Sequence, residues 1–328
     1  YKRLFLAHLH DLTSQWLDKC TERQRMVANT QREAARYLLK LRDAQENFLG
    51  FVKLNYPDWE IADFQLELID ALDKLEKGTL GTNNLLITMP PRHAKSTFGT
   101  VLFPAYFMAR TPIRYIMSCS YNSQLATDFG RQVRSVVEAR PIHQAFPDFN
   151  LSQDSRAADV WRTENGGAYF AVGIGGTTSG RPANLLLVDD PIKSREDAES
   201  MTQRNKTWNY YTSALATRLQ PESDHTPPKQ IVILTRWHPD DLAGRLIESD
   251  DWQEGRWTHV NFPAIKTRFT GKKIGRRHLP EDHPMYVKAG QLSNRPSERY
   301  IKEEETVALW PDRFSLEELR RRERLNPR

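Results

Sequence analysis

The chain has 328 residues, of which 39% are hydrophobic and 27% are charged. This composition is that of a soluble globular protein and excludes a disordered chain. Its apolar runs are too short to cross a bilayer, so we expect no membrane association. The net charge of +5 mildly favours an anionic partner such as nucleic acid. Two distant cysteines give neither a zinc spacing nor a disulfide framework, which fits a reducing cytosol.

The first part of the chain is predicted to be helical. Leu6, Leu9, Leu12 and Trp16 recur at helical spacing, and no glycine occurs before Gly50. We therefore expect residues 1–54 to form an N-terminal helical arm ahead of a catalytic core that spans residues 55–262.

Short apolar runs alternate with longer helical stretches through this core. The expected strands are Leu85–Met89, Arg114–Ser118, Ala168–Val172, Leu185–Asp189, Gln230–Thr235 and Thr258–Phe262. The expected helices are Ser96–Ala109, Ser123–Glu138, Glu196–Leu219 and Asp240–Glu248. Continuous apolar strands separated by helices predict an α/β fold with a mostly parallel sheet covered on both faces.

A hairpin is expected within the core. Residues 165–167 read Asn-Gly-Gly, which suits a tight turn between Trp161 and Phe170. We expect this hairpin to be an insert beside the main sheet.

Residues 89–96, which read Met-Pro-Pro-Arg-His-Ala-Lys-Ser, have the features of a phosphate-binding loop. They follow an apolar strand and open a helix, whose first backbone amides can bind phosphate oxygens. Lys95 would contact the β- and γ-phosphates, and Ser96 would bind Mg²⁺. Met89 and Ala94 stand where glycines are expected, so an ordinary strand–loop–helix with a surface lysine is the alternative.

Two adjacent carboxylates end the buried strand Leu185–Asp189. A parallel strand that ends at the carboxyl edge of a sheet would bring Asp189 and Asp190 beside the phosphate loop. Asp189 would then hold Mg²⁺, and Asp190 would orient the attacking water. The alternative is a solvated acidic turn before Pro191.

A third strand ends in Thr235 and Arg236. At the same sheet edge, the Thr235 hydroxyl could sense the γ-phosphate. Arg236 could take part in this site or could be bound within its own loop.

Residues 263–328 are predicted to be a basic lid or linker region. Four of its side chains are candidate DNA contacts, unless they belong to a solvated hairpin: Lys272, Lys273, Arg276 and Arg277. A capping box at residues 315–318, which read Ser-Leu-Glu-Glu, predicts a helix. We interpret the acidic run 303–305 as the solvated face of another helix and not as a metal site.

Three segments together resemble the ATPase domain of tailed-phage terminase large subunits, which is a P-loop NTPase. They are residues 90–97, 179–191 and 234–242, and the resemblance extends from about residue 55 to the end of the chain. These proteins pump double-stranded DNA into a preformed capsid. The resemblance therefore implies an ATP-hydrolysing motor that uses Mg²⁺.

The resemblance also assigns roles to residues outside the phosphate loop. Arg92 matches a catalytic arginine, and Arg181 matches an arginine that acts on the site of a neighbouring subunit. Asp190 stands where the family often has glutamate, which leaves its role less closely matched. Thr235 and Arg236 fall in the motif that couples hydrolysis to movement. The residues implied to bind the nucleotide are Tyr56, Gln65, Pro91, Arg92, His93, Ala94, Lys95, Ser96 and Thr97.

The partners and location follow from the same resemblance. It implies double-stranded DNA, a homo-oligomeric ring that is a pentamer in the family, a portal protein and a small terminase subunit. It places the protein in the host-cell cytoplasm, transiently at the portal vertex of the procapsid, and not in the mature virion. The nuclease domain usual in the family is not expected in this fragment, because no acidic triad follows residue 262.

Two other functions remain open at this stage. A helicase-like nucleic-acid motor would need a second domain of the same kind, for which the residues after 262 are too few and too irregular. An inactive P-loop scaffold is suggested by the missing glycines of the phosphate loop.

Overall fold

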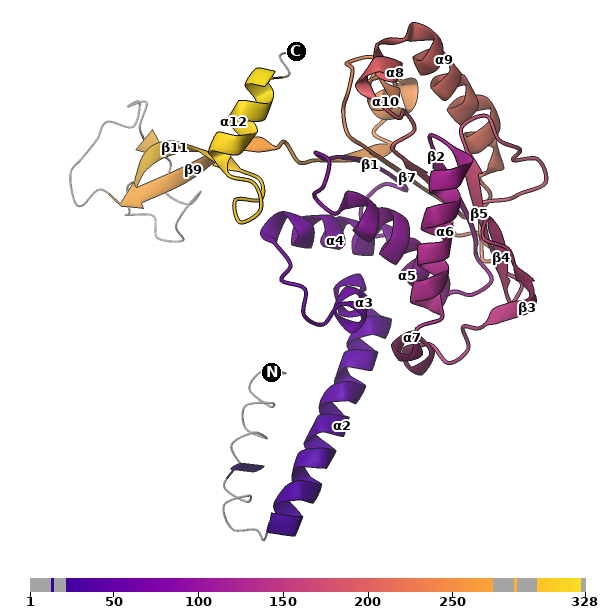
Figure 1. Ribbon diagram of the computed structural model, residues 1–328, viewed down its shortest axis with the longest axis vertical. Coiled ribbons are helices and arrows are strands. Elements are labelled where there is room, and N and C mark those ends of the chain that lie inside the picture. The colour runs from indigo at the N-terminus through magenta and orange to yellow at the C-terminus, as the bar shows by residue number, and fades with distance from the viewer. Residues whose placement is uncertain (1–12, 15–21, 274–285, 288–299, 326–328) are drawn as a thin grey trace.

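The computed structural model describes residues 13–14, 22–273, 286–287 and 300–325. Figure 1 shows an α/β body, a long helix that projects from it, and a small separate sheet that carries the last helix. The helical spacing from Leu6 to Trp16 and the basic residues Arg276 and Arg277 lie outside the described residues.

The main sheet has eight strands in the order β3-β4-β5-β2-β6-β7-β1-β8. In this spatial order, all neighbouring strands from β5 through β2, β6, β7 and β1 to β8 are parallel. The pairs β3–β4 and β4–β5 are antiparallel. This confirms the predicted mostly parallel sheet. The strands are β1 Asn84–Thr88, β2 Tyr115–Ser120, β3 Leu151–Arg156, β4 Val160–Thr163, β5 Ala168–Gly173, β6 Leu185–Asp189, β7 Lys229–Leu234 and β8 Trp257–Asn261.

Both faces of this sheet are buried under helices, since alternate residues of the strands β5, β2, β6, β7 and β1 enter two different apolar clusters. In β6, Leu185 and Leu187 join one cluster, while Leu186 and Val188 join the other. A strand buried on both faces needs a continuous apolar run, as seen here. The covering helices are α4 Asp63–Glu76, η1 Thr97–Leu102, α5 Phe103–Arg110, α6 Ser123–Val137, α7 Arg140–Ala145, α8 Arg195–Glu199, α9 Met201–Tyr210, η2 Tyr211–Leu215, η3 Ala216–Arg218, α10 Leu242–Ile247 and α11 Asp250–Gln253.

Two core predictions need correction. The single helix expected over Glu196–Leu219 is broken at Ser200, which has an extended backbone and whose hydroxyl accepts the amide of Gln203 at 3.4 Å to start α9. The hairpin is not an insert beside the sheet. Its second strand, β5, pairs in parallel with β2, so the hairpin extends the main sheet, where Trp161 stacks on Tyr169.

The N-terminal region consists of the projecting helix α2 (Glu22–Glu46) and the short helix α3 (Phe48–Asn55). Most of the described side chains of α2 are exposed. In α3, Phe48 and Phe51 are fully buried, and the ring of Phe48 packs against Phe103 and Tyr106 of α5. The last turns of this region therefore belong to the hydrophobic core.

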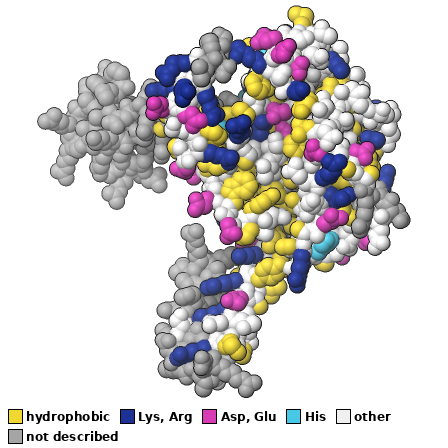
Figure 2. Space-filling model, viewed as in Figure 1, with side chains coloured by type: hydrophobic (Ala, Val, Ile, Leu, Met, Phe, Trp, Pro, Cys, Tyr) yellow, Lys and Arg dark blue, Asp and Glu magenta, His cyan; other side chains and the backbone are white. Residues whose placement is uncertain are grey.

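The C-terminal region forms a three-stranded antiparallel sheet of β9 (Ile265–Lys273), β10 (Tyr286–Val287) and β11 (Tyr300–Ala308), followed by α12 (Leu316–Leu325). The predicted cap is present, since the Ser315 hydroxyl accepts the amide of Glu318 at 3.1 Å. On the face seen in Figure 2, basic side chains gather over α12, which carries Arg320, Arg321, Arg322 and Arg324.

The acidic run 303–305 was wrongly predicted to be helical. It lies in β11 and pairs with Thr270, Phe269 and Arg268 of β9. A charge run without periodicity does not determine its own secondary structure, and pairing with a neighbouring strand decides it here. No helix within the described ranges is both long enough and apolar enough to span a membrane.

A buried ion network closes the amino end of the sheet, away from the carboxyl ends of its parallel strands. The Nε of Arg114 lies 3.0 Å from both carboxylate oxygens of Glu222, and one Nη lies 3.1 Å from Glu76 of α4. The guanidinium also donates to the Phe107 carbonyl at 2.8 Å and lies over the Phe107 ring. Arg114 therefore joins the start of β2 to α4, α5 and the segment before β7.

We predict that Arg114→Ala lowers the free energy of unfolding by about 3–5 kcal/mol. The buried carboxylate of Glu222 is then left without its cation, and among the described residues Glu76 keeps only Arg110, at 3.6 Å. Urea denaturation at neutral pH measures this loss. Lys74→Ala is the control, since Lys74 pairs with Asp70 on the surface and its removal costs less than about 1 kcal/mol. Equal, small losses in both variants would contradict the prediction.

Candidate functional site

Three loops meet at the carboxyl edge of the sheet, where β6, β7 and β1 are consecutive neighbours. The loop after β1 carries Lys95, β6 is followed by Asp190, and β7 is followed by Thr235. The Lys95 Nζ lies 2.8 Å from the Asp190 Oδ2 and 3.1 Å from the Thr235 hydroxyl. The Lys95 side chain therefore spans β7 and bonds to groups from the ends of both other strands.

The phosphate loop has the backbone of a glycine-containing loop although it contains no glycine. Arg92 and Ala94 adopt φ values of 64° and 66°, in the left-handed region that glycine enters without strain. Such conformations cost about 1–2 kcal/mol for other residues and persist only when the surroundings hold them. Met89, the other departure from the usual pattern, is tied to β7, because its amide donates to the Leu234 carbonyl at 3.2 Å.

The packing of His93 helps to keep the loop in this conformation. Its ring is 2% exposed and stacks on Phe314 with a centroid distance of 4.9 Å, while Phe64 and Trp310 contact it from other sides. The Nδ1 lies 2.9 Å from the Pro91 carbonyl, and burial lowers the pKa of the ring. The side chain therefore packs under the loop and holds the loop against these aromatic rings.

Asp189 is 1% exposed at the end of β6. One carboxylate oxygen accepts the Thr100 hydroxyl at 2.8 Å, and the other is buried without a partner within the described structure. Burial, and then the neighbouring charge of Asp190, raise the pKa of Asp189 to about 6. A buried carboxylate oxygen without a partner suits a divalent cation. Because Asp189 lies beside η1, the helix that follows the phosphate loop, Asp189 and Ser96 together could hold Mg²⁺.

Asp190 is fixed at both carboxylate oxygens. Its Oδ1 accepts the Thr235 amide at 2.8 Å, and its Oδ2 pairs with Lys95. Its φ of 42° lies in the left-handed region, as expected where a strand turns sharply into a functional loop. The Thr235 hydroxyl in turn donates to the Met89 carbonyl at 3.2 Å. Thr235 thus contacts the other two loops of the site.

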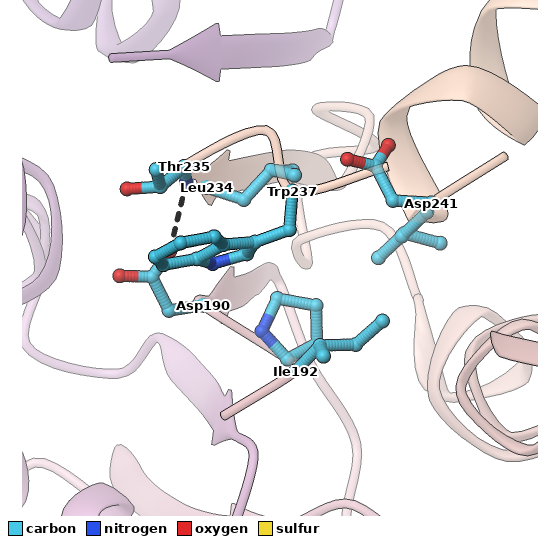
Figure 3. A pocket seen from close by; sticks show the side chains of 8 residues that line it. Asp190, Ile192, Leu234, Thr235, Trp237 and Asp241 are labelled. Atoms are coloured by element: carbon cyan, nitrogen blue, oxygen red, sulfur yellow. Dashed lines mark hydrogen bonds between the residues drawn. The ribbon is translucent and has the colours of Figure 1, made fainter. Parts of the chain in front are cut away.

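Trp237 is a site residue that we did not select from the sequence. Figure 3 shows its indole beside the hydrogen-bonded pair of Asp190 and Thr235. These residues line a cavity of about 10 Å³, the size of one water, together with Pro191 and Ile192. The sequence signal was present, because Trp237 lies inside the third motif, at residues 234–242.

Arg236 is bound within its own loop. Its Nε lies 2.8 Å from Asp241, and an Nη donates to the Pro239 carbonyl at 3.0 Å. Asp241 also caps α10 by accepting the amide of Gly244 at 3.0 Å. The arrangement orders the loop after β7 and directs the guanidinium toward Asp241.

Tyr56 and Gln65 lie on the side of α4. Gln65 is fully buried, and its Oε1 accepts the Ala62 amide at 3.1 Å while its Nε2 has no partner among the described residues. Tyr56 is 38% exposed and contacts the ring of Trp59, which packs on Phe98 in the helix after the phosphate loop. Both residues are therefore near that helix, and the Gln65 amide still offers an unused donor.

Arg181 lies away from the Lys95 cluster of its own chain. Its guanidinium is over the ring of Phe170 at 5.6 Å and makes no ion pair in the part of the chain that the structure describes. Phe170 of β5 pairs with Met117 of β2, which in turn pairs with Leu186 of β6. Asp189 lies three residues beyond Leu186, so Phe170 is two strand spacings and three residues away from Asp189. These steps amount to roughly 10 Å across the sheet and roughly 10 Å along it.

The candidate DNA contacts are described only in part. Lys272 and Lys273 belong to β9, where they pair with Ile301 and Tyr300 of β11. Arg276 and Arg277 fall outside the described residues.

The chain is structurally similar to phage large terminases. The crystal structure of the HK97 bacteriophage large terminase has a TM-score of 0.43 and 16% identity, over 64% of this chain and 41% of that one. The large terminase of a thermophilic bacteriophage, in complex with ATP-γ-S, has a TM-score of 0.38 and 11% identity, over 62% and 45%. The ADP complex of that terminase has a TM-score of 0.36 and 10% identity, over 62% and 45%.

The chain thus spans less than half the length of each of these structures. No protein-family profile and no curated protein matches the sequence.

We predict that Asp189→Asn stabilises the metal-free protein above pH 6 by about 1–3 kcal/mol. The folded state raises the pKa of this carboxyl from 3.8 to about 6, so it binds the proton more tightly than the unfolded state does. Stability is therefore greatest below pH 4 and is lost as pH rises toward 6. The neutral asparagine side chain of the variant does not ionise, so this loss of stability does not occur, and its amide oxygen can still accept the Thr100 hydroxyl. Thermal unfolding with a chelator, at pH 4 and pH 7.5, measures the difference, and a variant less stable at pH 7.5 would contradict it.

Proposed function

We propose that the chain is a Mg²⁺-dependent ATPase that drives translocation of double-stranded DNA into a viral procapsid, as the ATPase domain of a terminase large subunit. The observation that carries this proposal is the contact of Lys95 with both Asp190 and Thr235, beside the orphaned oxygen of Asp189. The three motifs that resemble the terminase ATPase supply these residues.

ATP binding would use the loop from Pro91 to Thr97. Backbone amides at the start of η1 would bind phosphate oxygens, and Lys95 would exchange its contact with Asp190 for the γ-phosphate. Arg92 adds a second positive charge within the loop. Asp189 and Ser96 would hold Mg²⁺, which supplies charge neutralisation for the phosphates when bound. Tyr56 and Gln65 would meet the adenine.

Asp190 would act on the attacking water. The Thr235 amide orients its carboxylate, which accepts the proton that the water loses as the water oxygen attacks the γ-phosphorus. The bond from that phosphorus to the oxygen shared with the β-phosphate breaks, and ADP retains the electron pair. Trp237 covers the other side of Asp190, which limits the approach of bulk water from there.

Thr235 would report the state of the γ-phosphate, since it contacts Met89, Lys95 and Asp190. Arg236 would order the same coupling loop through Asp241.

Residues 1–54 would be an arm, residues 55–262 the motor core and residues 263–328 a basic lid or linker with Lys272 and Lys273 near DNA.

The motor would work as a homo-oligomeric ring, a pentamer by resemblance, in which Arg181 reaches the site of a neighbouring subunit. The position of Arg181 over Phe170, far from Asp189 of its own chain, supports action between subunits. The ring would meet a portal protein and a small terminase subunit in the host-cell cytoplasm.

We predict that Lys95→Ala lowers ATP turnover by about 10²–10³-fold, because the charge that stabilises the transferring phosphoryl group is lost. Phosphate release under steady-state conditions measures turnover, with Lys74→Ala as the matched surface control. Near-normal hydrolysis by Lys95→Ala would place the site elsewhere. A wild-type protein without turnover would favour the inactive scaffold.

We predict that Arg181→Ala retains ATP binding but loses about 10³-fold or more in hydrolysis, as expected for an arginine supplied between subunits. Mixing Arg181→Ala with Lys95→Ala should restore part of the activity, because some interfaces then pair an intact loop with an intact arginine. The measurement is turnover against mixing ratio, with native mass spectrometry to establish that mixed rings form. Mixed rings without activity, confirmed in linked dimers with a single intact interface, would contradict the assignment.

A further inference from the structure

A second hollow opens at the carboxyl edge of the sheet, on the other side of Asp190 from the phosphate loop. It has a volume of about 120 Å³ and lies over the ends of β2, β5 and β6, which contribute Tyr121, Ile174 and Pro191. The helix α9 closes the opposite wall. Ligands of open α/β sheets bind outside the carboxyl ends of the strands, so this hollow is in a position suited to a ligand.

The charged groups of the hollow favour an anion. Lys193 and Lys206 line it, both are exposed, and neither forms an ion pair within the described residues. Asp197 contributes one carboxylate, so two positive charges stand against one negative charge. Lysine side chains without acidic partners are available to bind a ligand and keep their full charge for it.

The uncharged polar groups narrow the class of anion. Tyr121, Gln203 and Thr207 line the same hollow, and each carries a hydrogen-bond donor. Lysine, tyrosine, glutamine and threonine are the side chains that commonly contact the phosphate and sugar groups of DNA. Apolar side chains make up the remaining wall. Contacts of this kind to phosphate and sugar carry no direct information on base identity.

We propose that this hollow binds a phosphodiester group of double-stranded DNA through Lys193 and Lys206. The proposal rests on the proposed DNA-translocating function and names a contact point on the core, separate from the basic region after residue 262. Binding here is electrostatic and independent of sequence, as a protein that moves along any DNA segment requires.

The hollow is connected to the catalytic carboxylate through the chain itself. Lys193 follows Asp190 by three residues, and the intervening Pro191 and Ile192 line both this hollow and the small cavity beside Trp237. Lys206 approaches the segment before Arg181, since a Cβ on Gly175 would lie 3.7 Å from its Cε. A phosphate held between the two lysines would therefore lie beside the segment that follows Asp190 and near the segment that precedes Arg181.

The test measures binding of a fluorescein-labelled duplex of about 30 base pairs by anisotropy, without nucleotide, over a range of salt concentrations. The test variant is Lys193→Ala/Lys206→Ala. The matched control is Lys40→Ala/Lys53→Ala, which removes two exposed lysines from α2 and α3, and Lys193→Arg/Lys206→Arg keeps both charges. Circular dichroism and thermal unfolding establish that every variant folds.

We expect the test variant to bind the duplex about 10-fold or more weakly, with the slope of log affinity against log salt reduced by about 2. The control and the arginine variant should match the wild type. An unchanged affinity and slope in the test variant, with wild-type binding intact, would overturn the proposal and leave the proposed function standing. The same result together with loss of product inhibition by inorganic phosphate would assign the hollow to free phosphate instead. A wild-type protein that binds no duplex would refute the DNA partner itself.

Discussion

The site depends on one lysine, Lys95, that pairs with Asp190, the second of two adjacent carboxylates at the end of a buried strand. Asp189 and Asp190 repel each other, and burial penalises the ionised form of Asp189, so a nearby cation is required. β7 lies between β1 and β6, so the Lys95 side chain crosses the end of β7, where it donates to the Thr235 hydroxyl, before it reaches Asp190. Each of the three strands must therefore end at its observed residue, since a shift by one residue would turn its side chain to the other face.

The second constraint is a strained loop without glycine. Arg92 and Ala94 hold left-handed backbones, and the aromatic cluster around His93 fixes the loop from below. Phe314 in that cluster follows the C-terminal sheet, more than 200 residues away along the chain. The C-terminal region therefore supports the phosphate loop directly. A ligand that reshapes the loop must also disturb these ring contacts, which links the two regions mechanically.

The sequence predicted the parallel strands well because burial on both faces demands continuous apolar runs, and Leu185–Asp189 was matched in both bounds. The sequence did not predict β3, because Ser152, Gln153 and Asp154 interrupt the apolar pattern there. It also did not predict the helix break at Ser200, whose hydroxyl caps the start of α9. The motifs identified Lys95, Asp189, Asp190 and Thr235 as candidates. The His93 cluster and the Lys193–Lys206 hollow could not be predicted, because they join side chains that meet only after folding.

The segment after β6 lies between the loop proposed to bind the γ-phosphate and the hollow proposed to bind DNA. On one side, Asp190 is bound to Lys95, which the γ-phosphate would attract. On the other side, Lys193 faces the hollow proposed for a DNA phosphate. Only Pro191 and Ile192 separate Asp190 from Lys193, and the φ angle of Pro191 is fixed by its ring. Lys193 therefore cannot move far without moving the Asp190 carboxylate. If DNA binds at Lys193, a pull on that side chain would therefore reorient Asp190. Release of Lys95 from Asp190 would in turn loosen the segment that carries Lys193. Linkage requires these two effects to be equal in free energy, so a DNA contact that alters ATP affinity must itself be altered by ATP.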